Sequence, residues 1–276
     1  MKKPSVTLLC SKVGMSRQNY YRTRKRRLRK EIDERLITEL VRAERSLQPR
    51  LGGRKLYFML KAELKSAGVS IGRDRFFKAL RANNLLLEPL PKVPYTTNSR
   101  HSLPIFGNRI KGLEVRRPNE VWVSDITYIR TAKGFIYLSL ITDKYSRKIV
   151  GYHAEDTLET ELCLKALDKA VEGKPEGVQI IHHSDRGCQY CSHSYVGKLQ
   201  EEGFEISMTE EKHCSENALA ERVNGILKQE YWLGSTFRSK EQAYRAVAEA
   251  IHLYNNRRPH TALNYKTPEQ VHSMAA

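Results

Sequence analysis

The sequence predicts an α/β fold in which a mixed sheet with flanking helices follows a basic helical region. From residue 121 on, three successive segments rich in β-branched and aromatic residues are separated by short turns, as in antiparallel strands. Helical and strand patterns then alternate, which is typical of α/β sheets. Residues 88–120 hold five of the ten prolines and lack periodicity, which indicates a linker between two parts of the chain.

The second half is expected to form a five-stranded mixed sheet. Its predicted strands are residues 121–130, 135–143, 147–154, 178–185 and 204–208, and its predicted helices are residues 157–172, about 192–202, about 215–233 and about 239–256. We find no internal repeat in these segments, so the chain is not a repeat array.

Charge is distributed unevenly along the chain. Residues 1–120 contain 29 Lys and Arg against 10 Asp and Glu, whereas residues 121–276 contain 19 against 21. Nine residues, 22–30, include seven basic ones. A polyanion such as DNA suits the first half, because each neutralised phosphate releases counterions. A basic surface that only keeps the chain in solution is the alternative.

The first half also contains a helix-turn-helix-like pattern. Residues 31–47, 52–68 and 72–83 each carry apolar residues at helical spacing, and a short link after Gly68 joins the last two segments. A helical hairpin that serves only packing explains the same pattern. The last helix carries basic residues that we expect to contact DNA: Arg73, Arg75 and Lys78.

The predicted organisation has four parts. They are a basic amino-terminal segment (1–30), a helical helix-turn-helix-like DNA-binding region (31–87), a proline-rich linker (88–117) and an α/β core with carboxy-terminal helices (118–276). No apolar stretch approaches the roughly 20 residues of a membrane span, and no secretory signal is recognisable. Five cysteines without a dense framework indicate the reducing cytoplasm.

Three acidic residues in the second half are candidates for a metal site. Asp125 lies within a hydrophobic strand, where a carboxylate is costly to bury without a cation or hydrogen-bond donors. Asp185 ends the predicted strand 178–185, so its side chain can project beyond the sheet. An isolated aspartate there is equally compatible with a turn or a helix cap.

Glu221 lies on a predicted helix with two distinct faces. Leu219, Val223 and Ile226 share the face that packs on the core. Glu221 lies on the opposite face, which also carries Asn217, Asn224, Gly225 and Lys228. Glycine there leaves room for a ligand, although a solvated helix face has the same composition. Together, the three acids are typical of sites that hold two divalent cations for phosphodiester chemistry.

Several motifs carry a specific resemblance. The segments WVSDITYI, HSDRGCQY, ENALAERVNGILKQE and YNNRRPHTALNYKTPEQV closely resemble the retroviral-integrase-like transposases of bacterial insertion sequences, and SRQNYYR and GGRKLYFMLK resemble their amino-terminal segments. The 35 residues between Asp185 and Glu221 match the spacing of that family. The similarity is greatest to the group whose catalytic domain is encoded by a second, overlapping reading frame.

This resemblance implies a ribonuclease-H-like integrase catalytic core, two Mg²⁺ ions with Mn²⁺ as a substitute, and cleavage and transfer of DNA strands. It implies that Asp125, Asp185 and Glu221 are the catalytic metal ligands and that Lys228 contacts DNA near the scissile phosphate. The implied partners are the element's terminal inverted repeats, target DNA, further copies of the chain and the upstream-frame product, the last as a frameshift fusion. The implied location is the bacterial cytoplasm, at the nucleoid. Arg257 and Arg258 are expected to face DNA and to shape the end of the last long helix.

The chain departs from the family at a few positions. Glu216 stands where the family usually has aspartate, and Cys188 and Cys191 stand where small polar residues are usual. Cys188 and Cys191 also suggest a zinc site with nearby histidines, but the second ligand pair of such sites is missing. A non-catalytic DNA-binding regulator or competitor of transposition is the alternative function.

Overall fold

The computed structural model describes residues 5–88, 103–210 and 214–274. They divide into two compact units, one of residues 1–47 and 51–88 and the other of residues 48–50 and 89–276. Part of the predicted linker, residues 89–102, lies outside the described residues. Each unit has its own hydrophobic core, so the two are described separately.

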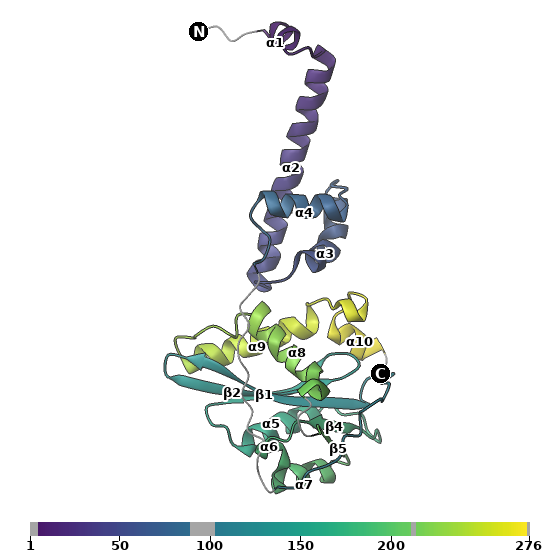
Figure 1. Ribbon diagram of the computed structural model, residues 1–276, viewed down its shortest axis with the longest axis vertical. Coiled ribbons are helices and arrows are strands. Elements are labelled where there is room, and N and C mark those ends of the chain that lie inside the picture. The colour runs from purple at the N-terminus through teal and green to yellow at the C-terminus, as the bar shows by residue number, and fades with distance from the viewer. Residues whose placement is uncertain (1–4, 89–102, 211–213, 275–276) are drawn as a thin grey trace. The chain divides into compact units, whose positions relative to one another are not determined.

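The first unit is helical (Figure 1). Its helices are α1 (Val6–Lys12), α2 (Arg17–Leu47), α3 (Gly53–Ser66) and α4 (Arg73–Ala82). The predicted boundary at residue 30 falls within α2, because residues 17–47 contain no glycine or proline and the basic run continues as helix. Surface ion pairs one turn apart, such as Arg27–Glu31 and Arg35–Glu39, give this polar helix modest support.

Helices α3 and α4 are amphipathic, as their sequences predict. Leu56, Leu60 and Leu64 of α3 are buried against Phe76 and Leu80 of α4, in a core that α2 completes. Three basic residues of α4 are exposed on the outside: Arg73, Arg75 and Lys78. Their contact with DNA stays a prediction.

The second unit contains the predicted five-stranded mixed sheet. Its strands are β1 (Val121–Thr131), β2 (Gly134–Asp143), β3 (Ile149–Glu155), β4 (Ile181–Ser184) and β5 (Glu205–Met208), in the spatial order β3-β2-β1-β4-β5. Strands β1, β2 and β3 pair antiparallel, as expected, and β4 and β5 run parallel to β1. The central position therefore belongs to β1, the strand that contains Asp125.

Helices cover both faces of this sheet (Figure 1). One face carries a core around Trp122 and Leu167, which is covered by α5 (Thr160–Val171), α6 (Cys188–Cys191) and α7 (His193–Glu201). The other face carries a core around Ile129 and Tyr254, which is covered by α8 (Ala218–Glu230) and α9 (Lys240–Asn256). Helix α10 (Pro268–Met274) follows α9 in the chain. Helix α5 lies close to β3 because residue 151 is glycine. A Cβ there would stand 2.4 Å from the carbonyl oxygen of Ala166. No described helix has the length and apolarity that crossing a membrane requires.

Candidate active site

Asp125 lies near the middle of the central strand, and its side chain is 9% exposed. Its Oδ1 accepts a hydrogen bond from the backbone N–H of Ile126 (3.0 Å), and its Oδ2 accepts one from Nδ2 of Asn224 (2.8 Å). Burial raises the pKa of Asp125 to about 7, with a smaller contribution from the charge of Asp185. The ionised carboxylate is therefore costly in the metal-free protein.

Asp185 follows β4, the parallel neighbour of β1. The parallel pairing of Val123 with His183 places the end of β4 beside the middle of β1, so Asp185 follows at the level of Asp125. Oδ1 of Asp185 accepts a hydrogen bond from the backbone N–H of Gly187 (3.0 Å), and a Cβ at residue 187 would stand 3.1 Å from the same oxygen. Glycine thus allows the chain to turn closely around this carboxylate.

Glu221 lies in the first turn of α8 and is partly buried. Its pKa is raised by burial and by the charge of Asp185, and the pKa of Asp125 is in turn raised by both Asp185 and Glu221. The three carboxylates therefore act on one another electrostatically. The three acids that the sequence singles out, from β1, the end of β4 and α8, thus lie within electrostatic reach of one another.

The carboxylates suit a divalent cation by their chemistry, although within the described residues no three His, Cys, Asp or Glu side chains lie close enough to hold one ion. Hard cations such as Mg²⁺ prefer carboxylate oxygens and keep several waters, so a few protein ligands suffice. Both hydrogen-bond donors to Asp125 that the contacts above identify are neutral. A cation at Asp125 would offset the cost of burying its charge, which favours metal binding here.

In metal-free protein, we expect Asp125→Asn to raise the free energy of unfolding relative to wild type, and to raise it more at pH 8 than at pH 5. The folded-state pKa of about 7 exceeds the ordinary 3.8, so the contribution of Asp125 to stability is fully present below pH 3.8 and is lost as pH rises through 7. The gain should grow by on the order of 2–3 kcal/mol between these pH values. Urea unfolding in the presence of chelator measures this free energy. An equal gain at both pH values would contradict the raised pKa of Asp125.

Two asparagines fix α8 against the central strand: Asn217, the N-cap residue just before the helix, and Asn224 within it. Nδ2 of Asn217 donates to the carbonyl oxygen of Ser124 (2.9 Å), and Nδ2 of Asn224 donates to Asp125. Both asparagines are buried. Sequence reasoning assigned them to the face of Glu221 but missed their contacts. The available signal was two residues of low helix propensity, seven positions apart, on one face.

Lys228 lies two turns beyond Glu221 on the same helix. Its Nζ stands 4.2 Å from the ring centroid of Tyr128, three residues after Asp125 in β1, and Tyr128 is 40% exposed. Burial lowers the pKa of Lys228, while the charge of Asp125 acts in the opposite direction. The ammonium is thus held beside the acids by a cation–π contact, and Tyr128 is a further residue that the sequence did not reveal.

We expect Lys228→Ala to lower DNA cleavage and joining by about 5- to 150-fold at limiting DNA, the range of a charge-assisted hydrogen bond to a phosphate. Metal binding and the unfolding midpoint should stay close to wild type. A cleavage and joining assay beside a metal titration tests this, with Gln229→Ala, an exposed neighbour, as the control. Wild-type activity at sub-saturating DNA would remove Lys228 from the site.

The two arginines after α9 differ in their surroundings. Arg257 is exposed, whereas the side chain of Arg258 is 3% exposed. Nε and Nη2 of Arg258 donate to the two carboxylate oxygens of Glu230 (2.9 and 2.8 Å), and Nη1 lies 2.9 Å from Nε2 of His260. This geometry supports the structural half of the prediction for Arg258 and does not favour a contact with DNA, because its guanidinium is already occupied.

The positions that depart from the family have ordinary structural partners. Oε2 of Glu216 accepts a hydrogen bond from the backbone N–H of Glu210 (2.6 Å). Cys188 is exposed, whereas Cys191 is buried beside Met208 and its pKa is raised to about 11 by burial. The described residues contain no metal cluster around these cysteines, so the zinc hypothesis has no support there. His213, a histidine near this pair in the sequence, lies outside the described residues.

Comparison with known proteins agrees with this architecture. Two family models described as integrase core domains match residues 115–214 and 202–268. The chain is 34% identical to the insertion element IS600 uncharacterized 31 kDa protein of Shigella sonnei, over 97% of this chain and 100% of that protein. It is 29% identical to the transposase for insertion sequence element IS629 of Shigella sonnei, over 95% and 90% of the two chains.

Among solved structures, the simian T-cell lymphotropic virus intasome in complex with the PP2A regulatory subunit B56 gamma has a TM-score of 0.50 and 19% identity, and the match covers 80% of this chain and 74% of that chain. This likeness concerns the fold, and it agrees with the predicted integrase-type, ribonuclease-H-like core. The similarity to the IS600 protein extends over nearly the whole chain. The chain therefore belongs to the family of bacterial insertion-sequence transposases with an integrase core domain.

Proposed function

We propose that this chain is an active DNA transposase, a polynucleotidyl transferase that cleaves and transfers DNA strands at the ends of an insertion sequence. The observation that carries the proposal is the buried Asp125, whose raised pKa reflects burial together with the carboxylates of Asp185 and Glu221. Asp125, Asp185 and Glu221 would hold the divalent metal, two Mg²⁺ ions with Mn²⁺ as a substitute. Such a metal would supply Lewis-acid chemistry there, namely activation of an attacking oxygen and charge stabilisation of the leaving oxygen of the phosphodiester.

The remaining residues of the site position these groups. Asn224 orients the Asp125 carboxylate, and the backbone N–H of Gly187 orients that of Asp185. Asn217 fixes the start of α8 against β1 and thereby sets where Glu221 lies. Lys228, held over Tyr128, is placed to contact a phosphate of the bound strand. Phosphoryl transfer depends mainly on such positioning and on charge neutralisation.

The partners proposed for this activity are the element's terminal inverted repeats, target DNA, further copies of the chain on DNA and the upstream-frame product, fused by frameshifting. The basic first half supports the proposal for DNA, since its charge excess suits a polyanion. Arg73, Arg75 and Lys78, exposed on α4, and the exposed Arg257 are the proposed DNA contacts outside the acidic site. The proposed location is the bacterial cytoplasm at the nucleoid.

The test is cleavage and joining of labelled duplexes that carry the inverted repeats flanking the gene. The full chain, alone and fused to the upstream-frame product, is incubated with Mg²⁺, Mn²⁺ or chelator. We expect specific cleavage and joined products with either metal and none in chelator. Binding without cleavage under all conditions would instead identify a non-catalytic regulator of transposition.

A further inference from the structure

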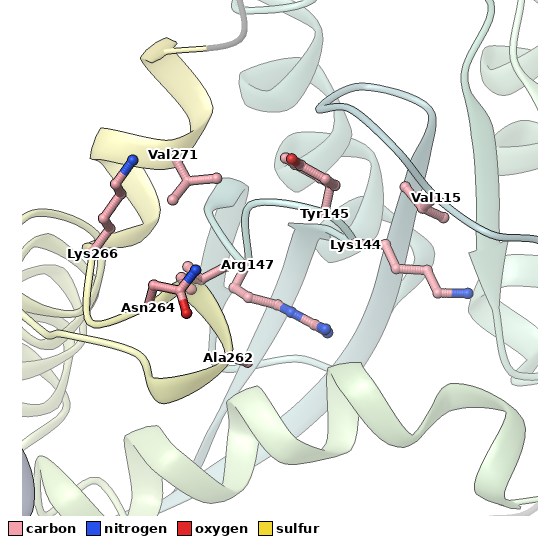
Figure 2. Close-up of a pocket in the computed structure, with 9 residues that line it drawn as sticks. Val115, Lys144, Tyr145, Arg147, Ala262, Asn264, Lys266 and Val271 are labelled. Atoms are coloured by element: carbon pink, nitrogen blue, oxygen red, sulfur yellow. The ribbon is translucent and has the colours of Figure 1, made fainter.

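A basic pocket lies in the second unit, between the β2–β3 turn and the loop that precedes α10 (Figure 2). Its volume is about 470 Å³. Lys144 and Arg147 line it from the turn, and Lys266 lines it from the loop, beside Asn264. All other lining residues are uncharged, so the pocket is positively charged. The loop belongs to the motif YNNRRPHTALNYKTPEQV, to which the acidic site assigns no role.

The three cations of this pocket are not neutralised within the described part of the chain. None of them has a carboxylate there within ion-pair distance, whereas Nζ of the adjacent Lys148 lies 2.8 Å from Oε2 of Glu269. Nζ of Lys266 contacts only the sulfur of Met274. The pKa of Lys144 is lowered by burial and by the charge of Arg147. An anion in the pocket would relieve this accumulation of positive charge.

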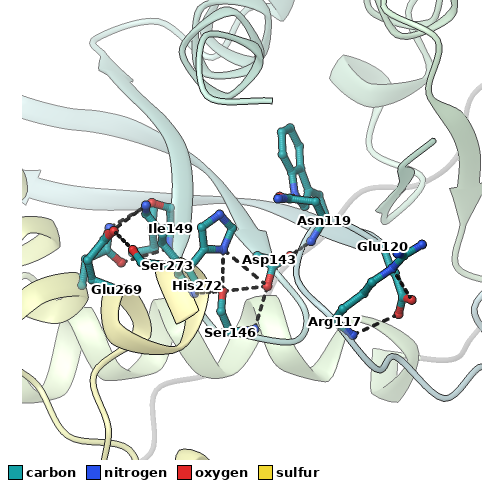
Figure 3. A network of polar contacts seen from close by, with 12 residues as sticks. Arg117, Asn119, Glu120, Asp143, Ser146, Ile149, Glu269, His272 and Ser273 are labelled. Carbon is teal, nitrogen blue, oxygen red and sulfur yellow. Dashed lines mark hydrogen bonds and ion pairs between the residues drawn. The ribbon is translucent and has the colours of Figure 1, made fainter. Parts of the chain in front are cut away.

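The turn that forms one wall is held rigidly (Figure 3). Asp143 is fully buried; its Oδ1 accepts hydrogen bonds from the backbone N–H and the hydroxyl of Ser146 (2.6 Å each), and its Oδ2 accepts one from the backbone N–H of Asn119 (2.7 Å). The backbone N–H of Arg147 donates to the carbonyl oxygen of Asp143 (3.0 Å), with Arg147 in the left-handed region at φ +67°. The turn therefore fixes the positions from which Lys144 and Arg147 project.

The opposite wall is held in a similar way. The backbone N–H of Tyr265 donates to the carbonyl of His260 (2.8 Å), and that of Lys266 donates to the carbonyl of Leu263 (3.0 Å). Asn264 and Tyr265 adopt φ values of 52° and 63°, in the left-handed region that residues other than glycine rarely occupy. Both walls are therefore preorganised, which reduces the entropy lost when a ligand binds.

We propose that this pocket binds the phosphodiester backbone of DNA at a distance from the reacting phosphate. Arginine and lysine are the usual phosphate contacts, and a backbone contact carries no base specificity. The backbone N–H of Lys144 donates to Val121, four residues before Asp125 on β1, which corresponds to about 13 Å along the strand. The pocket would therefore hold a phosphate a few nucleotides from the acidic site and not the reacting phosphate itself.

The proposal rests on DNA being the substrate of the proposed function, but its test does not require catalysis. DNA affinity of the full chain is measured by fluorescence anisotropy in chelator across a salt series, with duplexes that carry or lack the element's end sequence. For Lys144→Gln/Lys266→Gln we expect about 10- to 100-fold weaker binding to both duplexes, and a slope of log affinity against log salt that is shallower by about 1–2.

The matched control is Lys165→Gln/Lys169→Gln on α5, which removes the same charge from the opposite face of the sheet. It should change affinity by no more than about twofold. If the double variant does not fold, the DNA affinity of the single variant Lys266→Gln, at an exposed position, tests the proposal in its place. Equal losses in the pocket and control variants would overturn the proposal, as would lost self-association with unchanged DNA affinity, which would indicate a protein partner. Wild-type cleavage with unaltered binding by the pocket variants would reject the pocket and retain the proposed function.

Discussion

Asp125→Asn, Asp185→Asn and Glu221→Gln are each expected to lower strand cleavage by about 1,000-fold or more, while DNA binding in chelator stays within a few-fold of wild type. Each change would remove one of the three proposed anionic oxygen ligands of the divalent cations on which the proposed chemistry depends. The substituted amides preserve side-chain volume, and most of the positive charge proposed to bind DNA lies outside this site. The loss should therefore appear in the chemical step.

The measurement is single-turnover cleavage of end-containing duplexes, with Mg²⁺ and with Mn²⁺, beside a metal titration monitored by the unfolding midpoint. Metal should raise the midpoint of the wild type more than that of any of the three variants. Asp168→Asn serves as the control, because Asp168 is an exposed acid that pairs with Lys198 on the surface. Cleavage at the wild-type rate by all three variants would end the assignment of these acids.

Much of the second unit could be predicted from local patterns. Segments rich in β-branched and aromatic residues, with short turns between them, place β1, β2 and β3 within two residues of their observed bounds, because a hairpin needs only neighbouring segments. Helix α2 shows the opposite case. The composition of its basic run resembles that of a separate arm, yet residues 17–47 form a single helix. Ion pairs between side chains one turn apart support this helix, and its carboxy-terminal end packs on α3 and α4.

The candidate site was predictable in its acids and not in their supports. The costly position of Asp125 in a hydrophobic strand and the faces of α8 follow from sequence spacing alone. The contacts of Asn217, Asn224 and Lys228 depend on how α8 docks against β1, about 100 residues earlier in the chain. No local pattern encodes that register. Because Lys228 and Asn224 reach β1 only through this docking, the site is a property of the sheet–helix packing as much as of the acids themselves.

Arg258→Met is expected to lower the free energy of unfolding by about 3–5 kcal/mol, the cost of breaking a buried ion pair by removing one of its two members. The Glu230 side chain, which Arg258 contacts through both carboxylate oxygens, is 18% exposed. Glu230 is also the last residue of α8, where the helix dipole disfavours a negative charge. Arg258 thus offsets both the partial burial of the Glu230 carboxylate and its unfavourable position at the end of the helix dipole. It also links the segment after α9 to the helix that carries Glu221.

A double variant separates this structural role from a role in DNA binding. Arg258→Met/Glu230→Leu removes both charges, so its unfolding free energy in urea should recover most of the loss, since apolar pairs of similar volume often replace buried ion pairs without cost. Arg257→Met, at the exposed neighbouring position, should leave stability within about 0.5 kcal/mol of wild type. If Arg258→Met kept its stability and instead weakened DNA binding, the ion pair with Glu230 would be incidental and Arg258 would have to be exposed to DNA. The burial of its guanidinium against Glu230 and His260 argues for the first outcome.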